Sequence, residues 1–190
     1  MKKSLIHKIY LALIHYPVVN KNGEIITSAI TNLDLHDIAR ASKTFGVKKF
    51  YVVTPLNDQK EIAEKLISHW INGPGSINNP IRKQALELIS LLDTVDQVIQ
   101  DIKLKEGNFP KTVVTHASIH PQNISFDEIK IIINKNSPIL FLFGTAWGLS
   151  KDLIESSDYI LEPIRGNSEY NHLSVRSAVS IILDRLLGIN

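Results

Sequence analysis

Short apolar runs that alternate with segments of helical spacing constrain this chain most. The clearest run is ILFLF at 139–143, and others occupy 9–14, 50–54, 112–115 and 159–161. Runs that are this short and almost continuously apolar are typical of strands buried on both faces of a parallel sheet. The pattern therefore predicts an α/β fold, with a mostly parallel sheet covered by helices on both faces.

Helical spacing and capping residues fill the intervals between these runs. Ser125 with Glu128 and Thr94 with Gln97 have the spacing of a capping box, which begins a helix. The predicted helices cover about 34–45 (with Asn32 or Asp34 as the N-cap), 59–70, 81–92, 94–105, 126–134, a short segment from Ser150, and 172–187. The loop at 72–80 is the one hinge candidate, and it is too short for a domain linker. We therefore expect a single domain over 1–190.

Composition limits the class of protein. The chain has 190 residues, 44% of them hydrophobic, so a sizeable core can form. No apolar run approaches the roughly 20 residues of a membrane span, and polar residues interrupt the apolar start at 1–17, which we interpret as a first strand and not a signal peptide. The absence of cysteine fits a cytoplasmic location. A net charge of +2 permits nucleic-acid binding without predicting it.

Three segments that follow predicted strands carry the candidate ligand site. Ligands of open parallel sheets bind beyond the carboxyl ends of the strands, and the segments there are 115–118, 144–149 and 162–167. Gly144 allows a ligand to approach the backbone closely and Gly148 adds a second flexible joint, although an ordinary strand-to-helix turn explains the same two glycines. A dinucleotide fingerprint after the first strand and a P-loop are both absent, which argues against a Rossmann nucleotide site.

Two arginines lie in unusual places. The predicted last helix is apolar nearly all round, so we expect it to be buried on most faces, yet it contains Arg176. That arginine requires solvent, an acid such as Asp184 or Glu162, or an anionic group at a site. Arg40 is a solvated or a functional arginine, four residues beyond His36 on one helical face. The histidines show no spacing suited to a metal, and we expect none to bind.

These segments resemble the motifs of the SPOUT (α/β-knot) RNA methyltransferases. Residues 32–40 with Phe45-Gly46 are similar to the first motif, residues 140–149 to the second, and residues 162–166 with 171–178 to the third. Their order and spacing hold over nearly the whole chain. The group that the chain resembles most is a bacterial set of stand-alone domains, similar to a domain found fused to tRNA guanine-N1 methyltransferases.

The resemblance implies fold, cofactor and partners. It implies a deep C-terminal trefoil knot over about 110–190, a homodimer, S-adenosylmethionine as methyl donor, and methyl transfer to a nucleotide of tRNA or rRNA. Two departures matter, because common members have Glu where 145–147 reads TAW and Ser-Leu-Asn where 170–172 reads YNH. The base selected by better-known members therefore cannot be carried over. The alternative is a non-catalytic dimeric module that binds the donor and RNA.

The resemblance also assigns residues. The donor would be held by Thr115, His116, Ala117, Gly144, Thr145, Gly148, Leu161, Ile164, Asn171, His172, Leu173 and Arg176. Arg40, from the partner subunit, and Arg165 would orient RNA phosphate or polarise the base, and His172 or Glu162 would act as general base. A basic face of Arg40, Arg82 and lysines 2, 3, 8, 43, 48 and 49 would contact RNA, or would be an ordinary solvated surface.

Overall fold

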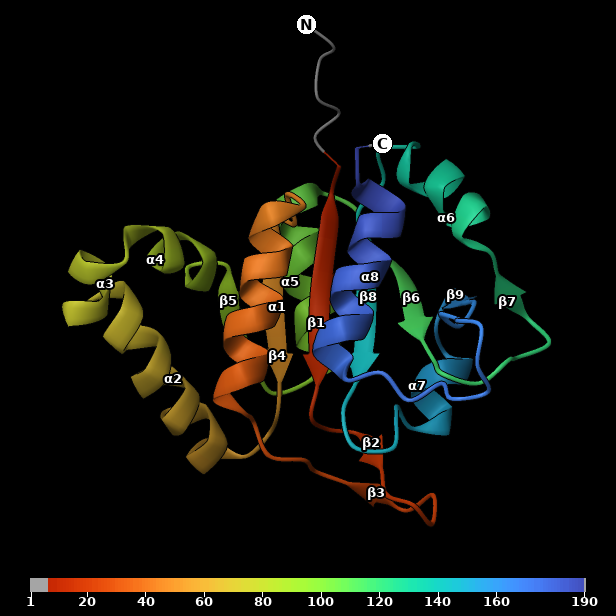
Figure 1. The fold of residues 1–190 in the computed structure, drawn as a ribbon, viewed down its shortest axis with the longest axis horizontal. Coiled ribbons are helices and arrows are strands. Elements are labelled where there is room, and N and C mark those ends of the chain that lie inside the picture. Colours follow the sequence, from red (N-terminus) through yellow and green to blue (C-terminus); the bar gives the residue numbers. More distant parts are fainter. Residues whose placement is uncertain (1–6, 190) are drawn as a thin grey trace, which may run out of the picture.

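The structure, a computed structural model, describes residues 7–189 and contains a seven-stranded sheet with the strand order β5-β4-β1-β8-β6-β9-β7 (Figure 1). The strands are β1 (Ile9–Ile14), β4 (Lys49–Val53), β5 (Ile89–Leu92), β6 (Lys111–Thr115), β7 (Asn123–Ile124), β8 (Ile139–Gly144) and β9 (Tyr159–Leu161). All neighbouring strands of this sheet are parallel, which confirms the predicted fold class. A separate antiparallel pair, β2 (Val18–Val19) and β3 (Ile25–Ile26), follows β1.

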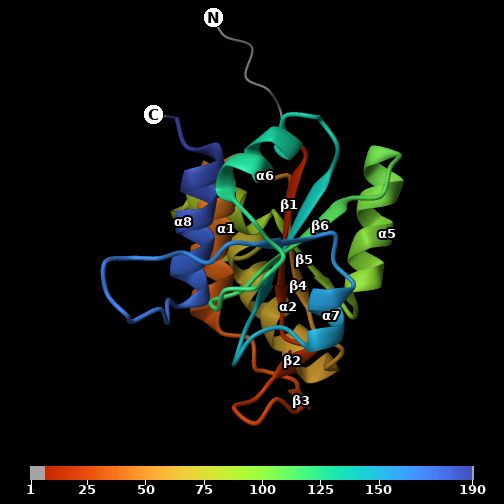
Figure 2. The same ribbon diagram turned by 90° about the vertical axis from the view of Figure 1, so that its right-hand side faces the viewer.

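Helices cover both faces of the sheet (Figure 2). One layer contains α1 (Asn32–Thr44), α2 (Asn57–Ile71), α4 (Pro80–Leu86), α6 (Phe126–Ile133) and α8 (Val175–Leu187), with the short α3 (Pro74–Asn78) joining α2 to α4. The other layer contains α5 (Val95–Glu106) and α7 (Lys151–Glu155). Alternate side chains of β1 enter alternate layers, because successive strand residues point to opposite faces: Leu11 joins the first core and Ala12 the second.

Local hydrogen bonds begin the helices where the sequence predicts them in three cases. Ser125 and Glu128 form both halves of a capping box at α6. Thr94 accepts from the Gln97 backbone N–H at α5, and Ser150 caps α7. The N-cap of α1 is Thr31, whose side chain accepts from the Asp34 N–H. The prediction of Asn32 or Asp34 at that position was therefore wrong by one to three residues.

The structure overturns three further predictions. The helix predicted over 81–92 ends at Leu86, because Ile89 to Leu92 pair with β4 as the edge strand β5. The loop predicted at 72–80 contains α3. The last helix begins at Val175 and not at His172, since Ser174 has extended backbone and its side chain caps the Ser177 N–H.

Helix α8 is buried along one stripe and not on most faces. Within this chain Val179, Ile182, Leu183 and Leu186 are buried, and its other apolar side chains stay partly accessible. Its packing partners are α1, α6 and β8. Over residues 7–189 no helix is both long enough and apolar enough to cross a membrane.

Candidate functional site

The three segments predicted to bind a ligand lie at one edge of the sheet. Strand β6 has β8 on one side and β9 on the other, so the parallel strands bring their carboxyl ends together. Thr115 pairs with Leu161 at the ends of β6 and β9, and the Thr115 hydroxyl donates to the carbonyl of Leu142 at 3.1 Å. Asn171 reaches back to this edge, and its Nδ2 donates to the carbonyl of Ala117 at 2.6 Å. Predicted cofactor residues from three segments are therefore neighbours, and β8 carries the fourth segment, 144–149, to the same edge.

The glycine loop at 144–149 has a different geometry from the one expected. A Cβ on Gly144 would lie 2.8 Å from the Leu149 backbone nitrogen, so its missing side chain makes room for the chain itself and not for a ligand. Gly148 has a φ of 114°, and no atom lies within 4 Å of the position its Cβ would take. The Val19 N–H donates to the Gly148 carbonyl at 2.9 Å, and the Trp147 N–H to the Val19 carbonyl at 3.1 Å. The loop is therefore anchored on β2 and is open at Gly148.

A partly buried chain of hydrogen bonds connects this loop to the end of β1. The Thr145 hydroxyl donates to the carbonyl of Ile14 at 2.9 Å and lies 2.5 Å from the Ser28 hydroxyl, which lies 2.9 Å from His15 Nδ1. The Thr145 hydroxyl donates its one proton to the carbonyl of Ile14, so the Ser28 hydroxyl must donate to Thr145. The Ser28 oxygen is then an acceptor, and His15 Nδ1–H must donate to it. Neutral His15 thus carries its proton on Nδ1, and its buried Nε2 has no hydrogen-bond partner among residues 7–189.

Burial determines the charge of His15. The side chain is fully buried, and burial lowers its pKa to about 4, against a smaller opposing effect of the Asp34 carboxylate. His15 and Ser28 were not among the predicted site residues. The one sequence signal was a histidine placed directly after the apolar run of β1.

Arg176 is held by two acids of α1. Its Nη1 donates to Asp34 Oδ1 at 3.1 Å, and its Nε lies 3.4 Å from Asp37 Oδ2. The expected partners, Asp184 and Glu162, were therefore wrong. Asp34 is nearly buried and also accepts from the Thr31 hydroxyl at 2.6 Å, so the ion pair fixes the start of α8 against the start of α1.

The two candidate general bases, Glu162 and His172, lie in different surroundings. Glu162 Oε1 accepts the Phe126 N–H at 2.8 Å, so this carboxylate serves the first turn of α6. His172 and Arg165 are both exposed in the segment between β9 and α8, where the His172 ring meets the edge of Tyr170 with centroids 5.4 Å apart. Arg40 is exposed on α1. The Leu161 side chain is fully buried, which leaves only its backbone for a ligand, whereas Ile164 is half-buried and Leu173 exposed.

These groups suit an adenosyl sulfonium ligand. The N–H groups of Thr145, Trp147 and Gly148 are already bonded to the carbonyls of Ile14, Val19 and Thr145. The backbone of 115–117 and the carbonyls of the glycine loop therefore remain as uncharged hydrogen-bonding groups, and Ile164 and Leu173 supply apolar surface. The open side of Gly148 lets a ligand meet the backbone directly. Among residues 7–189 no group of three or more His, Asp or Glu side chains is placed to hold a metal ion.

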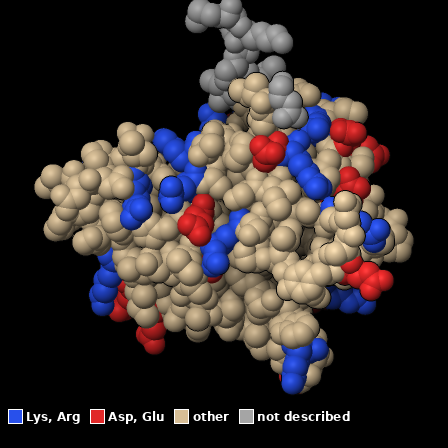
Figure 3. Space-filling view, in the orientation of Figure 1, with Lys and Arg blue, Asp and Glu red and all other residues tan. Residues whose placement is uncertain are grey.

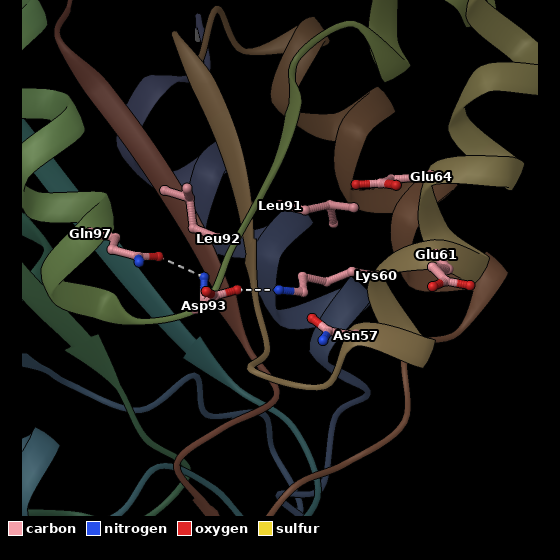
Figure 4. A pocket seen from close by; sticks show the side chains of 8 residues that line it. All are labelled: Asn57, Lys60, Glu61, Glu64, Leu91, Leu92, Asp93 and Gln97. Atoms are coloured by element: carbon pink, nitrogen blue, oxygen red, sulfur yellow. Dashed lines mark hydrogen bonds and ion pairs between the residues drawn. The ribbon is translucent and has the colours of Figure 1, made fainter.

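A pocket of about 520 Å³ lies away from this edge, between α2 and the β5–α5 connection (Figure 4). An ion pair of Lys60 with Asp93 crosses it, and Gln97 Oε1 accepts the Asp93 N–H at 2.8 Å. Glu61 and Glu64 add two further carboxylates to its wall. The pocket wall contains three acidic side chains and one lysine, so its net negative charge disfavours phosphate-rich ligands. None of the predicted site residues lines this pocket.

A parallel sheet with ligand loops gathered beyond its central strands defines an α/β ligand-binding domain. Residues 8–188 match the family described as SAM-dependent RNA methyltransferase, and the chain belongs to this family.

Relatives and a solved structure agree with this assignment. The chain is 44% identical over 180 residues to a protein of Oleidesulfovibrio alaskensis named tRNA (guanine-N(1)-)-methyltransferase, and the match covers 95% of this chain but 42% of that one. It is 40% identical over 183 residues to a protein of Aquifex aeolicus named as uncharacterized, covering 96% and 89%. The chain thus spans less than half of the first relative and most of the second.

The fold is similar to that of a solved SpoU methyltransferase. The SpoU methyltransferase AviRb of Streptomyces viridochromogenes, solved in complex with the cofactor AdoMet, superposes with a TM-score of 0.57 at 16% identity, over 95% of this chain and 57% of that one.

Proposed function

We propose that this chain binds S-adenosylmethionine at the carboxyl edge of β6, β8 and β9 and transfers its methyl group to a nucleotide of RNA. The observation that carries the proposal is the convergence of the three predicted loops at one sheet edge, in a chain that matches the RNA methyltransferase family over 8–188. The name of the relative from Oleidesulfovibrio alaskensis favours tRNA over rRNA as the first acceptor to test.

The donor supplies an electrophilic methyl group on a positively charged sulfur. We assign its binding to the backbone of 115–117, 144–148, 161 and 164, to Asn171, and to the apolar side chains of Ile164 and Leu173, which exclude water. Thr145 has a supporting role, because the His15–Ser28–Thr145 chain fixes its hydroxyl. Arg176 also supports the site by joining α8 to α1.

On the acceptor side, we assign Arg40 and Arg165 to RNA phosphate and His172 to proton removal. His172 is preferred to Glu162 because the Glu162 carboxylate already accepts the Phe126 N–H. In-line displacement gains most from positioning, so these groups act by holding the acceptor atom in line with the methyl group.

Three finer proposals accompany this function. The resemblance to SPOUT proteins supports a C-terminal trefoil knot, a homodimer, and a cytoplasmic location where tRNA is available. Two exposed apolar side chains support the dimer: Leu33 on α1 is 59% accessible and Leu173, just before α8, is 46% accessible. A second copy would cover them and would place its own Arg40 near the donor site.

Calorimetric titration with donor, followed by transfer of labelled methyl to purified tRNA and rRNA, tests the function. We expect donor binding in the micromolar range and label in tRNA. His172→Ala should lower kcat by about 100-fold with little change in donor affinity, and Glu162→Gln should leave kcat nearly unchanged. Wild-type protein that binds no donor would overturn the proposal.

The engagement of Glu162 by α6 also favours a second candidate, a non-catalytic module that binds donor and RNA. Donor binding without label in any RNA fraction, and unchanged nucleoside masses in RNA from cells lacking the gene, would select that candidate.

A further inference from the structure

Five side chains of α1, α2 and α4 form an aromatic and basic group away from the donor edge. We name it the Trp70 cluster: His36, Arg40, His69, Trp70 and Arg82. The Arg82 guanidinium carbon lies over the Trp70 ring, 4.5 Å from its centroid. The rings of His36 and His69 meet the Trp70 ring edge to face, with centroids 5.4 and 5.2 Å away.

The backbone fixes the two central members. A Cβ on Gly75 would lie 2.7 Å from Trp70 Cε3, so the glycine lets the α3 backbone pack directly on the indole. Asn79 Oδ1 accepts the Arg82 N–H at 3.0 Å and thereby caps α4. Because Trp70 is half-buried against the core, the cation–π contact holds Arg82 in one orientation.

The charges of the cluster are not neutralised. Within 7–189, neither Arg40 nor Arg82 has a carboxylate within 4.0 Å, whereas Arg176 has two. The pKa of His36 is lowered by burial first, then by the positive charge of Arg82, with a smaller contribution from Arg40 and an opposing one from Asp37. The cluster is therefore positive and includes a neutral imidazole that can donate or accept.

We propose that the Trp70 cluster is an RNA-binding surface, in which Arg82 and Arg40 hold backbone phosphate and His36 and His69 contact the adjoining sugar or base. The inference rests on the proposed function, because it identifies where the RNA acceptor is held outside the donor site. The Arg82 guanidinium stacks on Trp70 through its face, so the N–H groups on its edge can still bind two phosphate oxygens. Because the stacking already fixes the side chain, Arg82 loses little further rotamer freedom when it binds phosphate.

The position of the cluster favours RNA as the ligand. Helix α1 lies between α4 and α8, and Lys and Arg side chains gather over α1 and α4 on this face (Figures 1 and 3). The same helix carries Asp34 and Asp37, which hold the start of α8 beside the donor edge. An extended polyanion that reaches the donor edge can therefore cross α1 to Arg82. Lys8 does not belong to this basic face, because it pairs with Glu106 of α5 in the opposite helical layer. Lys2 and Lys3 lie outside the described residues.

Fluorescence anisotropy of labelled bulk bacterial tRNA, titrated with full-length protein over a salt series, tests the proposal. Arg82→Gln should weaken binding by about 10-fold and reduce the slope of log affinity against log salt by about one. Arg82→Lys should keep the slope but bind more weakly than wild type, since it loses the fork. Donor affinity should be unchanged in both variants.

Arg185→Gln is the matched control. Like Arg82, Arg185 lies over an aromatic ring, 5.0 Å from the centroid of Phe126, but it is more exposed than the half-buried Arg82 and is near the far end of α8. It should bind tRNA within about twofold of wild type. A further readout is the His36 pKa, measured by NMR, which should rise when tRNA binds because phosphate offsets the charge of Arg82.

The outcomes separate this inference from the proposed function. If wild type binds tRNA and Arg82→Gln binds equally well at every salt concentration, the surface is overturned and the proposed function stands. If Arg82→Gln is too unstable to interpret, the Arg82→Lys variant and the His36 titration test the RNA-binding surface instead. A His36 pKa that does not change when tRNA binds would count against that surface. If wild type binds no tRNA, the surface and the tRNA assignment both fail, and donor titration still tests the donor site.

Discussion

The hydrogen-bond partners of the buried His15 side chain could not be predicted from the sequence. Its partner Ser28 is 13 positions away, and Thr145 is 117 positions beyond Ser28. No spacing rule joins such residues, because the contact exists only once β1 and β8 lie side by side. The residues that were predicted at this edge, Thr145 among them, were found because they follow strands.

The stability of the protein should depend on pH through His15. Its pKa is near the ordinary value of about 6.5 in the unfolded chain and about 4 in the folded protein, so the unfolded state binds the proton more readily. Stability is therefore present above about pH 6.5 and is lost as the pH falls toward 4. Urea unfolding should show that this group removes about 2 kcal/mol between about pH 7 and pH 5.

His15→Asn tests the assignment, because it keeps an amide near Nδ1 and removes the titrating group. The variant should lose most of this pH dependence, whereas His172→Asn, which removes an exposed histidine, should keep the wild-type slope. An unchanged slope in His15→Asn would show that other groups cause the effect.

Elements were predictable where local hydrogen bonds define them. The capping residues at Thr94 and Ser125 begin α5 and α6 as expected, because each acts within three residues. Strand β5 was predicted as helix, because its four residues become a strand only by pairing with β4. The start of α8 was misplaced for a different reason: its Ser174 cap is local, but the apolar pattern continues upstream beyond it.

The ion pair between α8 and α1 should matter more than exposed pairs. Arg176→Met leaves the nearly buried Asp34 carboxylate without its charged partner, and we expect a loss of about 1–3 kcal/mol in the free energy of unfolding. Lys151→Met removes an exposed pair with Glu155 and should cost about 0.5 kcal/mol or less. Equal effects in the two variants would contradict this role for Arg176, and adding Asp34→Asn to Arg176→Met should recover part of the loss.

At the scale of the molecule, a parallel sheet was predictable but its strand order was not. Parallel strands expose their carboxyl ends on one edge, so the three loops were correctly expected to lie at the same edge of the sheet. The sequence contains no local signal that β8 lies between β1 and β6. The partners of Arg176 depend on this order and were missed with it.

One sheet shared by both helical layers should unfold as a unit. The chain has two tryptophans, Trp70 beside α4 and Trp147 in the glycine loop, which report on different regions. Trp147→Phe and Trp70→Phe each leave a single fluorophore, and both should give the same urea midpoint as circular dichroism, after correction for the stability of each variant. Separate midpoints for the two probes in matched variants would indicate two folding units and contradict a single domain.

The central place of β8 also has a consequence for synthesis on the ribosome. Strand β1 pairs on one side with the strand that begins at Lys49, but its other neighbour begins only at Ile139. While residues 54–138 are being translated, β1 is therefore an open and largely apolar edge, the kind of surface that recruits chaperones or pairs with the wrong chain. A nascent chain stalled before residue 139 should bind trigger-type chaperones, and one stalled well beyond residue 144 should release them.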